Sequence, residues 1–280
     1  MQVSLVLLSW VLGFAELPPA AARHPPWHAV ARDTEVPSDC VGTNYSAADA
    51  GTFHCGDWRL GPKDLPRAAA QGSSEDYESK VMGCILAGYD RLGGMTAGGL
   101  ISNFTVKVNG YWRYPKADGF SAKPNGKADT ETKTLKKNDY VDRFGSEAGY
   151  FLAPAGTLYK QRSIPPSNLN TQSPEGAKHP NFFGYRVNEP FSVTAGGIAP
   201  WFGQPGGGEQ FHTTASGNIS DLIKTGKLVR VQARELWDSG KLKCMSDGKK
   251  EPAPEPAPEP PKRRPLPWPG TGIDHTGVED

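Results

Sequence analysis

The chain has 280 residues, with 31 lysines and arginines against 30 aspartates and glutamates. This near-neutral balance argues against nucleic acid or an anionic membrane as the main partner, because both attract strongly basic proteins. The 33 glycines and 26 prolines favour many turns and short strands over a helical bundle. Hydrophobic residues, at 37%, still suffice for a core.

Residues 1–22 have the features of a secretory signal peptide. Residues 3–15 are almost all apolar, and small residues follow at Ala15 and at residues 20–22, where cleavage is plausible. The first residues lack Lys and Arg, and a buried N-terminal helix is the alternative. The apolar run is too short to span a membrane, and no other candidate span exists. We therefore expect a secreted or cell-surface protein without a membrane span.

Cysteines and glycosylation sequons independently support export. The four cysteines are an even number without metal-type C-x-x-C spacing, so they predict two disulfides. Three pairings are possible, and we favour Cys40–Cys55 together with Cys84–Cys244. N-x-S/T sequons predict N-glycosylation of an exported chain at Asn44, Asn103 and Asn218.

The first structural elements that we expect after a proline-rich lead-in are two helices. Residues 76–89 form the clearer one, because apolar side chains recur along it at steps of four. The serines at residues 73–74 should cap its start, and the glycines at residues 93–94 should end it. A second, short helix should cover about residues 96–103.

The chain from residue 106 onward favours short strands and turns. Residues 106–114 predict a hairpin around Asn109 and Gly110, and the polar residues 116–137 predict a surface loop. Ser220 should cap a short helix at residues 221–225. Further strands are expected at residues 185–187, 191–193 and 228–232.

The composition changes after Cys244. Residues 251–261 repeat Glu-Pro-Ala-Pro, which favours polyproline II and cannot build a core. We expect four parts along the chain: a signal peptide at residues 1–22, an N-terminal stabilising domain at 23–110, a catalytic domain at 111–246, and a disordered proline-rich tail at 247–280.

The most unusual stretch is A-P-W-F-G-Q-P-G-G-G-E-Q-F, residues 199–211. Its glycines allow positive φ or a close approach to a ligand, and the polar pair Glu209 and Gln210 follows them directly. This arrangement predicts the rim of a pocket, and a plain glycine-rich hairpin between two strands is the alternative. It is neither a Walker loop nor a dinucleotide fingerprint, because the required Lys and glycine spacing are missing.

Two arginines lie in turn-rich contexts, Arg143 in D-R-F-G and Arg162 in Q-R-S. Arginine binds phosphate in a bidentate fork and aromatic rings stack on planar ligands, so these residues suit a planar, phosphorylated ligand. A surface ion pair is the alternative for each. No G-x-S-x-G motif and no His-rich constellation supports a serine triad or a histidine metal site. D-R-L-G at residues 90–93 is similar to D-R-F-G, but it has no neighbouring glycine-rich turn. We therefore regard the similarity as coincidental.

The segments D-R-F-G-S-E-A-G-Y-F-L-A-P-A-G-T-L-Y-K-Q-R-S-I-P-P-S-N-L, Y-R-V and A-P-W-F-G-Q-P-G-G-G-E-Q-F follow one another in an order that strongly resembles the tuberculosis necrotizing toxin (TNT) domain. The likeness is to the secreted fungal NAD glycohydrolases that contain this domain. It covers about residues 140–234, and it is weaker at residues 56–62 and 89–94. The resemblance implies an α+β fold. Its mainly antiparallel β core would be like a reduced ADP-ribosyltransferase, with a small disulfide-supported helical region at the N-terminus.

The resemblance implies hydrolysis of NAD+ and NADP+ to nicotinamide and ADP-ribose, with no cofactor required. The family's catalytic positions match Arg143, Arg162 and Gln210. Neighbouring residues on a strand face opposite sides, so only one of Glu209 and Gln210 can face the pocket. The substrate-binding residues that we expect are Phe144, Tyr150, Phe151, Trp201 and Gly207. Either Tyr150 or Phe151 matches a further aromatic residue of the family, and the sequence does not decide between them.

The resemblance also implies a homodimer and allows a structural calcium ion towards the C-terminal side. Asp238 and Asp247 are available there, but no ligand set can be assembled from the sequence. Two other functions fit the same fold: a protein ADP-ribosyltransferase, and a non-enzymatic secreted surface or binding protein.

Overall fold

The computed structural model of the protein describes three stretches of the chain: residues 35–65, 76–170 and 181–246. The chain divides into the units Met1–Glu35 and Val36–Asp280, and every element given below lies in the second. The predicted signal peptide and the predicted tail, residues 1–22 and 247–280, lie outside the described residues. Within the described stretches no helix is long and apolar enough to cross a membrane.

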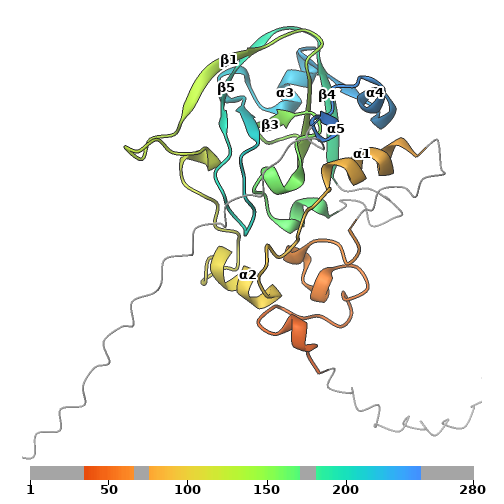
Figure 1. Cartoon of the computed structure of the whole chain (residues 1–280), viewed down its shortest axis with the longest axis vertical. Helices are drawn as coiled ribbons and strands as arrows, with labels where there is room; N and C mark the ends of the chain where they lie inside the picture. The colour runs from red at the N-terminus through yellow and green to blue at the C-terminus, as the bar shows by residue number, and fades with distance from the viewer. Residues whose placement is uncertain (1–34, 66–75, 171–180, 247–280) are drawn as a thin grey trace, which may run out of the picture. The chain divides into compact units, whose positions relative to one another are not determined.

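A seven-stranded antiparallel sheet forms the centre of the protein (Figure 1). Its strands are β1 Thr130–Leu135, β2 Tyr140–Phe144, β3 Phe151–Pro154, β4 Phe182–Val187, β5 Phe191–Gly197, β6 Glu209–His212 and β7 Leu228–Val231. They lie in the order β1-β5-β6-β3-β2-β4-β7, and every neighbouring pair is antiparallel. The predicted α+β class with a mainly antiparallel core is therefore confirmed.

Alternating side chains bury one face of the sheet. Along β5, Phe191, Val193 and Ala195 are buried, while Ser192 is exposed and Thr194 is half-buried. This period of two is the pattern of a strand with one face on the core. The buried residues join those of the other strands and of α3 in a single cluster. The strands predicted at residues 185–187, 191–193 and 228–232 are present, and the first two are longer than predicted.

One strand contradicts the sequence analysis. Residues 116–137 are not all surface loop, because β1 occupies part of them and pairs with β5 along its whole length. Only Leu135 of this strand is buried. The strand lies at the edge of the sheet, where polar side chains are tolerated and Thr is favoured. Its sequence therefore has no hydrophobic pattern from which the strand could be predicted.

The helices are short: α1 Tyr77–Ile85, α2 Ala97–Phe104, α3 Ile219–Lys224, α4 Ala233–Asp238 and α5 Lys243–Ser246. The first predicted helix is too long, because α1 ends at Ile85 and Gly88 already has a φ of 66°. Its start is capped by Asp76, whose Oδ1 accepts a hydrogen bond of 3.0 Å from the Ser79 amide. The serines predicted as caps, residues 73–74, lie outside the described residues.

The second predicted helix is confirmed as α2, with Thr96 as its N-cap. The cap predicted for the third is wrong: Asn218 caps α3, and its Oδ1 accepts a hydrogen bond of 2.9 Å from the Asp221 amide. Ser220 instead lies inside the helix. The helices α4 and α5 were not predicted, since each has fewer than seven residues and no clear periodicity.

Both predicted disulfides are confirmed. Cys40 and Cys55 are bonded with Cα atoms 5.4 Å apart, and Cys84 and Cys244 with Cα atoms 5.6 Å apart. In the chain-entropy account the first, closing about 15 residues, contributes about 3 kcal/mol. The second joins the end of α1 to α5 across 160 residues and contributes about 5 kcal/mol on the same account.

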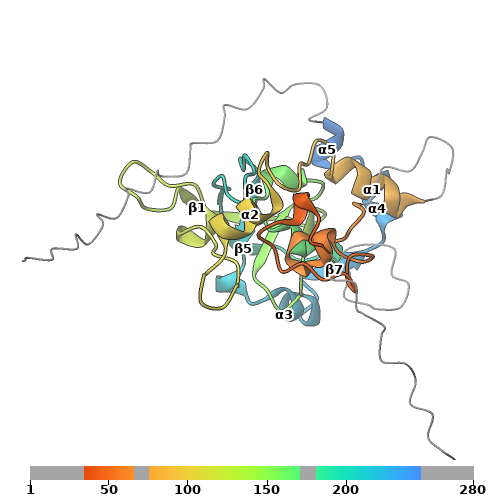
Figure 2. The same ribbon diagram turned by 90° about the horizontal axis from the view of Figure 1, so that it is seen from below.

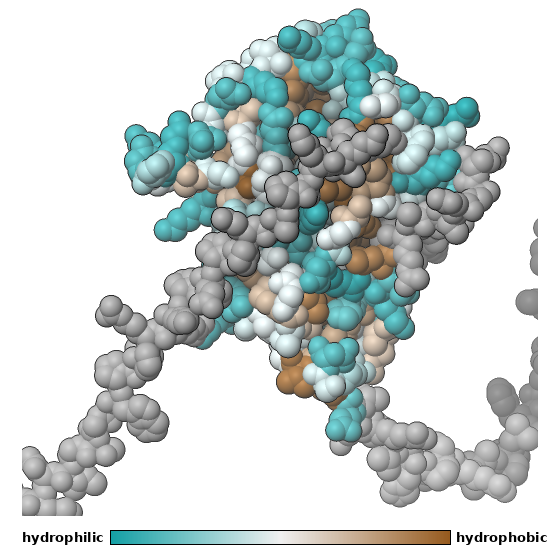
Figure 3. All heavy atoms as spheres, viewed as in Figure 1, coloured by the Kyte–Doolittle hydropathy of each residue, from teal (hydrophilic) through white to brown (hydrophobic). Residues whose placement is uncertain are grey.

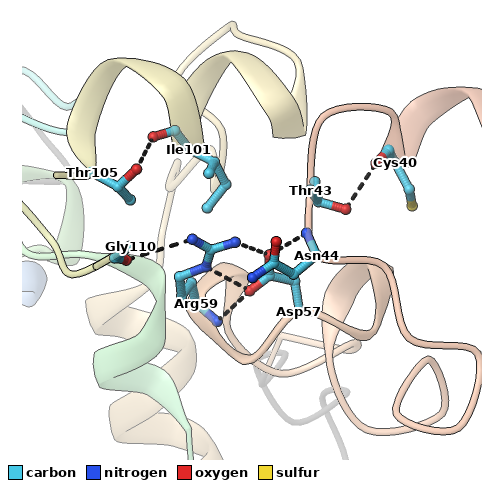
Figure 4. Close-up of polar contacts among 8 residues, drawn as sticks. All are labelled: Cys40, Thr43, Asn44, Asp57, Arg59, Ile101, Thr105 and Gly110. Atoms are coloured by element: carbon cyan, nitrogen blue, oxygen red, sulfur yellow. Dashed lines mark hydrogen bonds and ion pairs between the residues drawn. The ribbon is translucent and has the colours of Figure 1, made fainter. Parts of the chain in front are cut away.

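A buried ion pair organises the segment before α1 (Figure 4). Arg59 donates from Nε and Nη2 to the Asp57 carboxylate at 2.9 and 2.6 Å, and its Nη1 donates to the Gly110 carbonyl at 3.5 Å. The Asn44 amide donates to the same carboxylate at 3.0 Å. The pair thereby ties the first disulfide loop to the turn at residue 110. That turn carries one bridge, Thr105 to Trp112, in place of the predicted hairpin strands.

The region before residue 110 also supplies part of the core that supports the sheet. Val81, Met82 and Ile85 of α1 pack in one cluster with Phe144 and Tyr159. In both views α1 lies beside α4 and α5 (Figures 1 and 2). The surface in Figure 3 is mostly hydrophilic, with hydrophobic residues in separate patches, one of them over the N-terminal segment at the lower end.

Candidate active site

A cavity of about 370 Å³ lies beside the middle strands of the sheet. Its wall is formed by β2, β3, the start of β6, the residues after the 3-10 turn Tyr159–Gln161, and a segment that precedes β1. Five of the predicted site residues line it: Arg143, Phe144, Phe151, Arg162 and Gln210. The fold therefore brings the three separate sequence motifs to one hollow.

Arg143 lies on β2 and is held by backbone carbonyls. Its Nε donates to the Ser146 carbonyl at 2.7 Å and its Nη1 donates to the Phe151 carbonyl at 2.8 Å. Burial lowers the pKa of Arg143, and the nearby Tyr185 and Glu147 act in the opposite direction. A Cβ on Gly149 would lie 2.0 Å from Nη2, so only glycine lets the guanidinium occupy this place. With two of its five N–H donors used on carbonyls, the fork keeps donors for a ligand oxygen.

Arg162 is in a buried ion pair with Asp142. Its Nη1 lies 2.6 Å from Asp142 Oδ1, its Nη2 donates to Oδ2 at 3.0 Å, and its Nε donates to the Thr157 carbonyl at 2.9 Å. The side chains of Arg162 and Asp142 are 5% and 0% exposed. Burial raises the pKa of Asp142, while the Arg162 guanidinium and the Gly156 amide, which donates at 2.8 Å, act against that rise.

Arg162 is thus in an ion pair, but the pair is buried and is not the surface pair considered as the alternative. Because the fork faces Asp142, only the outer N–H groups of Arg162 can reach a ligand in the cavity. The guanidinium also lies 5.1 Å from the centre of the Phe144 ring, in cation–π range. Arg162 therefore shapes the cavity wall as well as lining it.

Gln210 and Glu209 face opposite sides of β6. Gln210 lines the cavity, and its Nε2 donates to the Asp118 carbonyl at 2.9 Å. Glu209 is turned to the other face, where its Oε1 accepts from Lys133 Nζ at 2.6 Å. Lys133 also sits 5.0 Å from the centre of the Phe211 ring. The strand alternation expected from the sequence places the amide, and not the carboxylate, in the cavity.

Phe151, and not Tyr150, is the second predicted aromatic in the cavity wall. The Phe151 ring is stacked on His212, with centroids 4.5 Å apart and an interplanar angle of 6°. Tyr150 is 39% exposed and meets His212 edge-on at 6.2 Å. Phe144 is buried and has edge-on or tilted contacts at 5.0 Å with Tyr159 and Phe182. The sequence alone left Tyr150 and Phe151 undecided, because the family aromatic could not be aligned to one of these neighbouring positions.

The glycine-rich turn does not line the cavity. Trp201 Nε1 donates to the Arg113 carbonyl at 2.7 Å, and Gln204 Nε2 donates to the Asp90 carbonyl at 2.6 Å. Gly207 has a φ of 82° with open space around the position of a Cβ. The residues that flank the turn, Ile198 and Gln210, are the ones that reach the cavity. The turn is therefore a scaffold for β6 and not the pocket rim itself.

The D-R-L-G stretch at residues 90–93 does have a glycine-rich neighbour, contrary to the sequence analysis. A Cβ on Gly93 would lie 2.4 Å from the Gly203 carbonyl oxygen, so the two backbones touch. The neighbouring Phe202 packs edge-on against Trp112 and tilted against Phe104, with ring centroids 5.2 and 5.3 Å apart. The segment before residue 115 thus supports the turn that leads into Gln210.

Several residues of the cavity wall were not predicted. Ser163 and Asn168 lie inside the quoted motif Q-R-S-I-P-P-S-N-L and could have been chosen from it. Ile198 immediately precedes the glycine-rich stretch. Tyr114, Pro115, Asp118 and Gly119 had no recognisable signal: Tyr114 ends the predicted hairpin, Pro115 follows it, and Asp118 and Gly119 lie in the predicted surface loop.

The predicted modification and metal residues have distinct surroundings. Asn44 is exposed, whereas Asn103 and Asn218 are half-buried. Of the acidic residues considered for calcium, Asp238 pairs with Arg234 at 3.5 Å and Asp247 lies outside the described residues. Within residues 35–65, 76–170 and 181–246 no group of three or more His, Cys, Asp or Glu could hold a metal ion.

Comparison with known proteins agrees with the motif assignment. Residues 134–231 match the family described as Tuberculosis necrotizing toxin. The conidial surface nicotinamide adenine dinucleotide glycohydrolase nadA of Aspergillus fumigatus is 37% identical over 201 residues, which are 71% of this chain and 78% of that protein.

Two solved structures are also similar to the chain. The tuberculosis necrotizing toxin complexed with its immunity factor IFT has 17% identity and a TM-score of 0.33, over 69% of this chain and 87% of that one. Rhs1-CT in complex with its cognate immunity protein RhsI1 has 17% identity and a TM-score of 0.26, over 38% and 80%. The identity to the Aspergillus protein, extending over most of both chains, decides the family. The chain belongs to the tuberculosis necrotizing toxin (TNT) domain family, alongside the conidial surface NAD glycohydrolase of Aspergillus fumigatus.

Proposed function

We propose that the protein is an NAD+ glycohydrolase, which cleaves the bond between nicotinamide and ribose to give nicotinamide and ADP-ribose. The observation that carries the proposal is the cavity that unites Arg143, Arg162 and Gln210 from three motifs. The name of the Aspergillus relative, an NAD glycohydrolase, supports the same reaction. A volume of about 370 Å³ suits part of a dinucleotide, as ligand pockets are typically about 300–1,000 Å³.

The chemistry needs little from the protein beyond positioning. Nicotinamide is a cationic pyridinium in NAD+ and leaves with the electron pair of the glycosidic bond as a neutral base, so no general acid is required. Water supplies the new C–O bond at the ribose carbon and loses one proton to solvent. The site has to hold the diphosphate and stabilise a ribose transition state with oxocarbenium character. No cofactor takes part in this scheme.

The residues divide these tasks between them. Arg143 is the main diphosphate ligand, because it lines the cavity and its fork, held by two carbonyls, retains N–H donors for a ligand oxygen. Arg162 keeps the wall in place through Asp142 and adds its outer N–H groups. Gln210 orients the attacking water or a ribose hydroxyl. Phe144 and Phe151 provide the apolar wall that receives a ring.

The wider setting of this activity is proposed from sequence features and from what the family resemblance implies. The proposed enzyme is secreted or held at the cell surface after removal of residues 1–22, and carries N-glycans at Asn44, Asn103 and Asn218. It also accepts NADP+ and acts as a homodimer. Residues 23–110 form a stabilising domain, an idea supported by the α1 side chains that pack against Phe144. A structural calcium ion towards the C-terminal side remains part of the proposal, with its ligands unassigned.

Incubation of the purified protein with NAD+, followed by chromatography of the products, tests the proposal. Equal amounts of nicotinamide and ADP-ribose are expected. ADP-ribose attached to an acceptor protein would indicate a transferase, and unchanged NAD+ would indicate a binding protein. The transferase outcome is not favoured by the structure, because the carboxylate of Glu209 is paired with Lys133 away from the cavity.

A further inference from the structure

One side of the cavity is closed by the 3-10 turn Ala117–Gly119, which has an unusual backbone. Ala117, Asp118 and Gly119 have φ angles of 55°, 54° and 81°, so three successive residues are left-handed. Such angles come easily to glycine but are unfavourable for the other two residues. A conformation of this kind persists only where surrounding contacts hold it, and it is common at functional sites.

Contacts with the end of β5 hold this turn. The Gly119 carbonyl accepts a hydrogen bond of 2.9 Å from the Ala199 amide, and the Ser121 amide donates to the Gly197 carbonyl at 2.8 Å. Between them Phe120, which is only 4% exposed, forms a bridge with Ile198. The turn is therefore anchored to the strand that pairs with β6, on which Gln210 lies.

The turn contacts Gln210 itself. The Asp118 carbonyl oxygen accepts the hydrogen bond of 2.9 Å from Gln210 Nε2. A carbonyl oxygen can only accept, so the amide nitrogen of Gln210 must face it and the amide oxygen must face elsewhere. Without this contact the two ends of the amide could exchange by rotation, because they have the same shape.

We infer that Ala117–Gly119 is a positioning element for Gln210. The Asp118 carbonyl fixes the amide so that its Oε1 is available in the cavity as an acceptor for the attacking water or a ribose hydroxyl. A water that attacks carbon must lose a proton, and an acceptor oxygen suits that step where an N–H would not. This inference rests on the proposed glycohydrolase function and on the role of Gln210 in it.

Three variants at two left-handed positions test the inference by NAD+ cleavage. Asp118→Val puts a β-branched residue where φ is 54°, and this should shift the carbonyl. Asp118→Asn tolerates the same angle and separates the effect of the backbone from that of the side-chain charge. Asn138→Val is the matched control, since Asn138 has a φ of 68° in the exposed β1–β2 turn.

The kcat of Asp118→Val should be about 10- to 100-fold below that of Asp118→Asn, as expected for a misplaced catalytic group, with similar KM values. Asn138→Val should lose thermal stability but keep its kcat. In a Gln210→Ala background, Asp118→Val should cause no further loss. If Asp118→Val does not fold, Asp118→Ala, which is less strained, should show the same order with a smaller difference.

Equal kcat values for the Val and Asn variants, or an undiminished effect of Asp118→Val in the Gln210→Ala background, would overturn the positioning role. Those results leave cleavage by the wild type intact. A wild-type protein that releases no nicotinamide would instead refute the proposed function, and the positioning role with it.

Discussion

The buried ion pair between Asp142 and Arg162 leads to a prediction about the stability of the fold. Replacing Arg162 by Met removes the partner of a carboxylate that is 0% exposed, and leaves the Thr157 carbonyl without its Nε donor. Breaking a buried ion pair from one side typically costs about 3–5 kcal/mol, because one charge is left uncompensated. For a chain of this size each kcal/mol lowers the Tm by about 2–4 °C. We therefore expect Arg162→Met to melt about 6–20 °C below the wild type at pH 7.

The loss should shrink in acid. Without the guanidinium, burial is opposed only by the hydrogen bond from the Gly156 amide, so the pKa of the Asp142 carboxyl rises further in the folded state. Stability associated with a raised pKa is fully present below the ordinary value of about 4 and is lost as the pH rises through the folded value. The gap in Tm between Arg162→Met and the wild type should therefore be smaller at pH 4 than at pH 7.

Calorimetry of three variants checks this reasoning. Asp142→Asn combined with Arg162→Met should recover much of the loss, because no buried charge remains and the amide oxygen can still accept from the Gly156 amide. Arg186→Met is the control. Its pair with Glu235, at 3.2 Å, joins side chains that are 30% and 44% exposed, so its loss should stay below about 1 kcal/mol. The account would be refuted by a Tm of Arg162→Met that equals that of Arg186→Met. It would also be refuted by a Tm within about 2 °C of the wild type, which corresponds to a loss of about 1 kcal/mol or less.

Three further predictions follow from other contacts. Arg143→Lys should cleave NAD+ poorly in a steady-state assay, because a single ammonium cannot hold the Ser146 and Phe151 carbonyls and a phosphate as a fork does; wild-type rates would remove the diphosphate role. Glu147 accepts from Arg230 and Tyr185, and chiefly the Arg230 contact lowers its pKa, so its stabilisation is present above a pH of about 4 and lost as the pH falls through the folded pKa. Glu147→Gln should then lower the Tm more at pH 7 than near pH 3, and an equal loss at both would contradict this. A chain that starts at Tyr111 should melt far below the full chain, because removing Val81, Met82 and Ile85 uncovers side chains worth about 1.5–3 kcal/mol each; an unchanged Tm would show that residues 23–110 do not stabilise the rest.

Local patterns in the sequence predicted the parts of the fold that depend on neighbouring residues. The short helix α2 and the strand β7 are of this kind. The edge strand β1 could not be predicted in this way, because its polar side chains carry no hydrophobic signal and only its pairing with β5 makes it a strand. The end of α1 was misplaced for a related reason: its apolar steps continue beyond Ile85, where the backbone turns at Gly88.

The site shows the same division. Strand alternation predicted that only one of Glu209 and Gln210 faces the pocket, and the family resemblance selected Gln210, which lines the cavity. The resemblance could not choose between Tyr150 and Phe151, because the family aromatic could not be aligned to one of them. The ion pair of Arg162 with Asp142 joins residues on different elements, and no local pattern reports such a contact. The wall formed by Tyr114 and Asp118 was missed because the end of a predicted hairpin and a polar loop become part of a site only through the fold.

The measurement that tests the central claim most directly compares NAD+ cleavage by the wild type, Gln210→Ala and Glu209→Ala, all with equal melting temperatures. Gln210→Ala should lose about 10²–10³ in kcat while still binding NAD+, because one transition-state hydrogen-bonding group is removed and Arg143 remains. Glu209→Ala should keep most of the wild-type activity, since that carboxylate pairs with Lys133 on the other face of β6. An inactive Glu209→Ala beside an active Gln210→Ala would contradict the account and point to a site that works with a carboxylate.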